Sequence, residues 1–253
     1  MTNREKYNFD YFTIKNYKRQ LELAQKNKFV FVKFSDKDLL QKGRKELLWR
    51  HDVEFSPDIA LKMAKIENEL NIKATYFFQL HSEFYNLLEM HFSNILLEIQ
   101  KLGHEIGLHF DAHYYKINRE EDLNSFIKLD KEYFEKIFEL ELKTFSFHNT
   151  DKFILSCTDF NYGGLINVYS SYFKDMFNYC ADSTGYWRYE VLEERLKDKT
   201  IDYLQVLTHD AMWSTQILSP RKRVRKAIQE NCDRVKKTYD KILIDFKAHN
   251  IDD

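Results

Sequence analysis

Residues 103–113 read Gly-His-Glu-Ile-Gly-Leu-His-Phe-Asp-Ala-His, and polar and apolar residues alternate after the first glycine. Such alternation is typical of a β-strand, so we expect a strand over residues 104–110, with Gly103 ending the helix before it. His109 then lies at the carboxyl end of the strand, and a turn there would place His113 on the same side. Neutral imidazole is the commonest metal ligand, but on their own the two histidines could equally be polar loop residues.

Strand-like and helical segments alternate along the rest of the chain. The hydrophobic periodicity predicts strands at residues 29–32, 47–52, 73–78, 104–110, 143–148, 178–182 and 201–208. It predicts helices over 9–26, 57–70 (capped by Ser56 and Pro57), 85–102, 119–139, 188–197 and 220–247. This order implies parallel βαβ units, hence an α/β barrel or an open doubly wound sheet. The six glycines form no phosphate-binding loop or dinucleotide fingerprint.

Length and composition describe an ordinary globular protein. We expect the 253 residues to form one domain spanning residues 1–253. A formal net charge of −1 gives no electrostatic footprint for nucleic acid, so no nucleic-acid partner is expected. No segment has the apolar length of a membrane span or of an export signal. The three widely spaced cysteines suggest no disulfide framework, and we expect a cytoplasmic protein.

Acidic residues and histidines follow most of the predicted strands. In a parallel α/β barrel the catalytic residues lie at the carboxyl ends of the strands, so these side chains are expected to converge. One carboxylate with two imidazoles would form a three-ligand site with an open position, as in catalytic zinc sites, although other divalent metals accept the same ligands. A second carboxylate could act as general base and a further histidine as general acid. The residues at these strand ends are Asp52, Glu54, His81, His109, His113, His148, Asp182, His209 and Asp210.

The order of these motifs resembles the polysaccharide deacetylase (NodB-homology) family of carbohydrate esterases. The resemblance covers about residues 47–213 and lies in Arg50-His-Asp-Val-Glu54, Ala74-Thr-Tyr-Phe-Phe78, residues 103–113, Asp182-Ser-Thr-Gly-Tyr-Trp-Arg188 and Leu204-Gln-Val-Leu-Thr-His209. It implies a distorted (β/α) barrel with fewer than eight strands. It also implies metal-dependent hydrolysis of an N-acyl group, usually acetate from an amino sugar.

The resemblance also implies roles for individual residues. Asp52 matches the base and Glu54 a metal ligand, although these two roles could be exchanged. His109 and His113 match the metal-binding histidine pair, and the metal is expected to be Zn²⁺ or another first-row divalent ion. His209 matches the general acid, and Asp182 and Arg188 match residues that orient or tune the base and the acid. Candidates for the substrate pocket, each as well explained by core packing, are Phe110, Tyr186, Trp187 and His148.

Three features depart from the family pattern. Asp52-Val53-Glu54 replaces an adjacent Asp-Asp pair, Phe147-His148-Asn149 replaces an arginine-proline motif, and no proline occurs between Pro57 and Pro220. These changes fit a divergent branch associated with surface-polysaccharide biosynthesis. We therefore expect a deacetylase acting on a small-molecule, nucleotide-linked or lipid-linked sugar. Two alternatives remain: a sugar-binding or structural relative without turnover, and a hydrolase of another non-peptide C–N bond, such as a formamide or cyclic amide.

Overall fold

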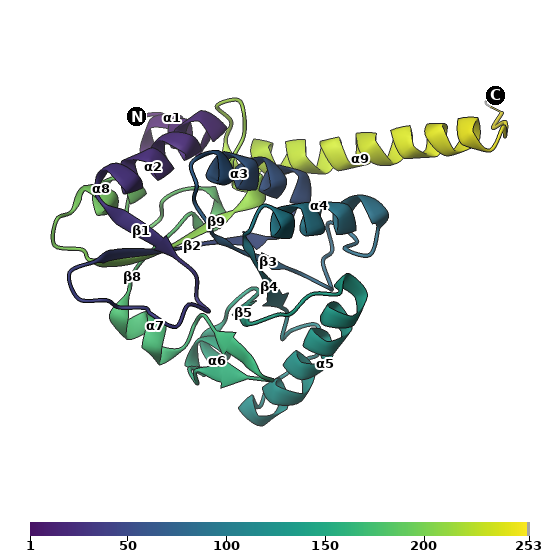
Figure 1. Ribbon diagram of the computed structural model, residues 1–253. Coiled ribbons are helices and arrows are strands. Elements are labelled where there is room, and N and C mark those ends of the chain that lie inside the picture. Colours follow the sequence, from purple (N-terminus) through teal and green to yellow (C-terminus); the bar gives the residue numbers. More distant parts are fainter. Residues whose placement is uncertain (252–253) are drawn as a thin grey trace.

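A curled, mostly parallel β-sheet forms the centre of the molecule and helices surround it, as the computed structural model of the chain shows for residues 1–251 (Figure 1). The strand order is β6-β7-β5-β4-β3-β2-β9-β8, and β1 lies beside the first part of β2. The strands are β1 (Phe29–Val32), β2 (Lys45–Val53), β3 (Thr75–Phe78), β4 (Glu105–Phe110), β5 (Thr144–Phe147), β6 (Asn161–Tyr162), β7 (Leu165–Asn167), β8 (Asn178–Ala181) and β9 (Tyr203–His209).

The expected distorted α/β barrel is confirmed, but residues 1–251 form a sheet of nine strands and not the fewer than eight that the family resemblance implies. Parallel pairing joins every neighbouring pair except the short hairpin of β6 and β7, and β6 and β8 form the two ends of the strand order, so the barrel is open on that side. The sequence predicts seven of these strands correctly. The hairpin escapes prediction because strands of two and three residues show no periodicity; its turn uses Gly163 and Gly164, both with positive φ.

All six helices predicted from the sequence are present, but their ends differ from the predicted ones. They are α1 (Asn3–Lys6), α2 (Ile14–Lys26), α3 (Pro57–Glu69), α4 (Met90–Lys101), α5 (Glu120–Phe138), α6 (Lys152–Ser156), α7 (Ser171–Met176), α8 (Leu192–Lys197) and α9 (Pro220–Asp245). Thr13 caps α2 through its side chain, so that helix begins at Ile14 and not at residue 9. Two other helices begin later than expected, α4 at Met90 and α8 at Leu192. No helix within residues 1–251 is long and apolar enough to cross a membrane.

Side chains of β2 alternate between two environments, and this alternation positions the functional residues. Leu47, Trp49 and Val53 belong to the large core, whereas Leu48 belongs to a smaller apolar cluster. Successive strand residues point to opposite faces, so Arg50 and Asp52 share the face of Leu48, and His51 faces the other way. The chain therefore presents a basic and an acidic side chain on one face of the same buried strand.

The buried carboxylate of Glu67, on α3, holds β2 from the opposite face. It bonds His51 Nε2 at 2.7 Å, Tyr76 Oη at 2.6 Å and the hydroxyl of Tyr17. Thr208 of β9 completes the group through His51 Nδ1 at 2.7 Å. Burial alone would raise the pKa of Glu67, but the charge and hydrogen bond of His51, aided by nearby histidine and tyrosine groups, hold this pKa below its usual value.

Glu67→Gln should lower the free energy of unfolding by about 3 kcal/mol at pH 7, because the amide cannot satisfy the donors around the carboxylate. A carboxylate whose pKa is depressed on folding contributes stability above its unfolded pKa of about 4.3 and loses it as pH falls through the lower folded value. The difference between the wild type and the variant should therefore shrink between about pH 5 and pH 3. Urea unfolding at several pH values measures this difference.

Glu69→Gln provides the matched control, since Glu69 is exposed on the same helix and pairs only with Lys18 at the surface. Its effect on unfolding should stay within about 0.5 kcal/mol. A difference in free energy of unfolding between the wild type and Glu67→Gln that remains constant down to pH 3 would contradict the depressed pKa of Glu67.

Candidate metal centre and cleft

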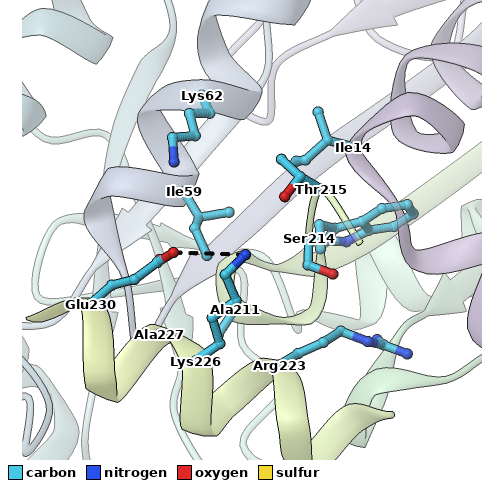
Figure 2. A pocket seen from close by; sticks show the side chains of 11 residues that line it. Ile14, Ile59, Lys62, Ala211, Ser214, Thr215, Arg223, Lys226, Ala227 and Glu230 are labelled. Carbon is cyan, nitrogen blue, oxygen red and sulfur yellow. Dashed lines mark ion pairs between the residues drawn. The ribbon is translucent and has the colours of Figure 1, made fainter. Parts of the chain in front are cut away.

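A cleft of about 690 Å³ opens where the carboxyl ends of the central strands meet. Its polar lining includes Asp52, Glu54, His109 and His209, which come from β2, β4 and β9 or from residues directly after them. A second pocket, of about 70 Å³, lies between α3, α9 and the start of α2; Figure 2 shows its lining, including the ion pair between Lys226 and Glu230. That small pocket contains none of the metal-ligating candidates, so the cleft is the candidate site.

Asp210 fixes the loop that carries Glu54. Its buried carboxylate accepts hydrogen bonds from the backbone amides of Glu54 at 2.9 Å, of Phe55 at 3.2 Å and of Ser56. Burial outweighs these bonds and raises the pKa of Asp210. Three backbone amides that follow β2 thus share the carboxylate of Asp210, the residue next to His209. These hydrogen bonds give the loop a defined path into the cleft.

Glu54, His109 and His148 form the one group of potential metal ligands found within residues 1–251. Glu54 Oε1 lies 3.3 Å from His109 Nε2 and 3.1 Å from His148 Nδ1, and the two nitrogens lie 3.2 Å apart. Tetrahedral ligands at 2.0–2.1 Å from a zinc ion are separated by about 3.3 Å from one another. The three atoms therefore have the spacing and the chemistry of three ligands at the corners of a tetrahedral site, with the fourth corner open.

The structure brings His148, and not the expected His113, to this group. Asp111 Oδ1 accepts from the backbone amides of His113 at 2.9 Å and of Tyr114 at 3.2 Å, forming a tight turn directly after β4. His113 therefore stays half-exposed, with Nε2 at 2.9 Å from the carbonyl oxygen of Asn149. His148, expected in the substrate pocket, directly follows β5, which pairs with β4 through Phe110 and Phe147.

Charges within the group favour an ionised glutamate. Burial alone would raise the pKa of Glu54, but the charge of His209 and the hydrogen bonds of His109 and His148 hold it well below its usual value. In His148, burial would lower the pKa, and Glu54 raises it through a hydrogen bond and its charge. Glu54 therefore presents an anionic oxygen to the two imidazoles, as a metal ligand must.

Ser146 orients His109, a contact that no sequence motif indicates. His109 Nδ1 lies 2.7 Å from Ser146 Oγ, which donates to Asp52 Oδ1 at 3.3 Å. Because Ser146 uses its proton on Asp52, it can accept from Nδ1–H of His109, which leaves Nε2 as the ring nitrogen that faces Glu54 and would bind an ion. Asp52 also receives a hydrogen bond from Arg50 at 3.4 Å, and all four side chains are buried. The cluster holds the His109 ring with Nε2 directed toward Glu54 and His148.

His209 and Asp182 are in direct contact. His209 Nδ1 lies 2.6 Å from Asp182 Oδ1, and Trp213 Nε1 donates to the other carboxylate oxygen at 3.0 Å. His209 Nε2 faces the metal-ligating group, 4.0 Å from Glu54 Oε1. Burial would lower the pKa of His209, but the charges of Asp182 and Glu54 raise it to about 10, so the imidazole is protonated and can donate toward the cleft.

The remaining expected site residues lie outside the cleft. Arg188 is exposed and lies over the ring of Tyr189, because the segment before α8 carries it away from Asp182. Phe110 is fully buried against Tyr115, Tyr186 packs on Tyr7, and Trp187 packs on Phe12 and Trp213, which corrects their assignment to the pocket. The aromatic lining instead consists of Phe55, Phe147, Tyr169, Tyr179 and Tyr189.

No family model and no curated protein matches the sequence. Among solved structures, a family 4 carbohydrate esterase from Bacillus anthracis is 16% identical, with 83% of this chain and 85% of that chain covered and a TM-score of 0.45. The peptidoglycan deacetylase PdaC from Bacillus subtilis is 14% identical over 82% of this chain and 99% of that chain, with a TM-score of 0.45.

A chitin deacetylase from the fungal pathogen Colletotrichum lindemuthianum is 14% identical over 73% of this chain and 81% of that chain, with a TM-score of 0.43. At TM-scores below 0.5 these likenesses imply no shared activity.

Proposed function

We propose that this protein is a metal-dependent hydrolase that removes an N-acyl group, most simply acetyl, from an amino sugar or a sugar-containing precursor. One observation carries the proposal: Glu54 and His109, two members of a possible three-ligand group completed by His148, line the same cleft as the carboxylate of Asp52 and the protonated His209. Amide hydrolysis needs these three functions together, because a water must be activated, an oxyanion stabilised and an amine protonated.

Glu54, His109 and His148 would hold the ion. A divalent cation such as Zn²⁺ bound there supplies a Lewis acid for the amide carbonyl and lowers the pKa of a water molecule. Asp52 lies next to this group and lines the cleft, with its carboxylate oriented by Arg50 and Ser146. It is the residue placed to accept the proton of the attacking water, while Glu54 is committed to the ligand group; this is the assignment of the two carboxylates that we propose.

His209 would act as general acid. Its Nδ1 is engaged by Asp182, so the proton available to a leaving amine is the one on Nε2, which faces the cleft. Asp182 does not itself line the cleft, and it acts through its hydrogen bond to His209 as a positioning residue. Base and acid stand on neighbouring strands, since Asp52 of β2 is in register with His209 of β9.

The substrate class rests on the cleft walls. Tyrosine and phenylalanine rings form much of the lining, and such rings suit the apolar faces of a sugar while their hydroxyls can bond its polar groups. A volume of about 690 Å³ holds more than one small ring. We propose a nucleotide-linked or lipid-linked amino sugar in the cytoplasm, within surface-polysaccharide biosynthesis.

His148→Ala should weaken zinc binding by about 100-fold, because it removes one of three ligands. His113→Ala, the matched control one turn beyond β4, should change the affinity by less than about 3-fold. Competition with a chromophoric chelator gives both dissociation constants, and elemental analysis gives the stoichiometry. Loss of zinc on His113→Ala with retention on His148→Ala would restore the histidine pair expected from the sequence.

His209→Gln should lower kcat for acetate release by roughly 100- to 1,000-fold while zinc stays bound, because it removes the proton donor and leaves the ligands in place. Asp182→Asn should lower kcat as well, whereas Asp175→Asn, at an exposed carboxylate of α7, should leave it unchanged. Acetate release is measured with N-acetylated oligosaccharides and with a nucleotide-linked N-acetyl amino sugar. Bound zinc without acyl release from any of these substrates would favour a sugar-binding protein without turnover.

A further inference from the structure

The contacts that anchor helix α9 to the rest of the molecule lie between Arg223 and Arg234. Arg223 donates to the carbonyl oxygens of Gly185 at 3.0 Å and of Met212 at 2.7 Å, Ala227 is buried, and Arg234 forms a bidentate pair with Glu89. Beyond Arg234 the helix extends away from the other elements (Figure 1). An isolated helix of this length is only marginally stable in water, so the projecting half lacks the packing that usually stabilises a helix.

An apolar stripe runs along α9 and the residue that follows it. The members are separated by steps of four, three, four, three and four residues, the spacing of the a and d positions of a coiled coil: Ile228, Cys232, Val235, Tyr239, Ile242 and Phe246. The five side chains other than cysteine are 44–79% exposed, and Cys232 is an exposed free thiol. At 100° per residue, the stripe lies about 120° around the helix from Arg223, Ala227 and Arg234, so the body of the molecule does not cover it.

We propose that α9 pairs with α9 of a second copy of this chain as an antiparallel two-stranded coiled coil centred near Lys237. In that register Ile228 faces Phe246, Cys232 faces Ile242 and Val235 faces Tyr239 of the second copy. The numbers of each facing pair add to the same sum, so one two-fold axis satisfies all six layers and the contact closes on itself.

Side-chain size and charge favour this orientation. Antiparallel pairing places a larger side chain against a smaller one in every layer, whereas parallel pairing would set Phe246 on Phe246 and Cys232 on Cys232. Residues 221–226 contain five basic residues and no acidic one, whereas residues 240–253 contain four aspartates and two lysines. Antiparallel pairing brings these oppositely charged ends together, and parallel pairing would bring the two basic ends together.

Sedimentation velocity of the full-length protein between 1 and 100 µM tests the pairing, with a dimer as the expected result. Val235→Glu combined with Ile242→Glu should raise the dimer dissociation constant by about 100-fold or more, because each charge enters the seam twice. Ile244→Glu is the matched control, since Ile244 is 75% exposed on the same helix but off the stripe. A wild-type monomer, or a dimer insensitive to the double substitution, would overturn the proposal.

Oxidative cross-linking then tests the orientation. Ile242→Cys should yield a covalent dimer through Cys232 of the second copy, and adding Cys232→Ser should abolish it. The wild type, whose other cysteines Cys157 and Cys180 are buried, should not cross-link. Cross-linking of the wild type through Cys232 would demonstrate the parallel arrangement and overturn the antiparallel one. Circular dichroism checks that each variant is folded, and neither result bears on the hydrolase.

Discussion

The buried ionic group around Glu67 sets the position of β2, and β2 in turn positions Asp52 and Glu54 in the cleft. Its carboxylate joins α3 to α2 through Tyr17, to β2 through His51 and to β3 through Tyr76. A carboxylate buried this fully is stable only when its donors stay in place, so the strand cannot slip in register without losing them. Such a slip would turn Asp52 toward the helices and His51 toward the cleft, which would remove the base from the site.

The site is assembled by register between neighbouring strands. His109 of β4 lies opposite Ser146 of β5, and Asp52 of β2 lies opposite His209 of β9. His109 is thus oriented by Ser146 on the adjacent strand, and His209 by Asp182, which directly follows the adjacent strand β8. This explains why residues spread over about 150 positions of the sequence converge without any long catalytic loop.

Sequence periodicity predicts the long strands and helices because burial imposes it, and the strand ends therefore reveal Asp52, Glu54, His109, Asp182 and His209. It does not reveal the second imidazole ligand. A spacing of four residues favours His113, but whether a turn after a strand points inward depends on Asp111, whose side chain closes the turn locally. His148 could be inferred only from knowing that β4 and β5 are neighbours, which is a tertiary fact. Likewise, the aromatic residues of 186–187 pack in the core because α1 and the segment after it cover them.

Asp210 ties the Glu54 loop to the end of β9, and Ser146 fixes the ring of His109, so the ligand triangle is held at a set size. Such a frame selects among cations by radius. Ions with bonds near 2.0–2.1 Å match edges of 3.1–3.3 Å, whereas Ca²⁺, with oxygen ligands at 2.3–2.6 Å and six to eight of them, would have to spread the triangle apart. In the proposed site, the hydrogen bonds behind Glu54 and His109 would therefore favour small first-row cations over Ca²⁺.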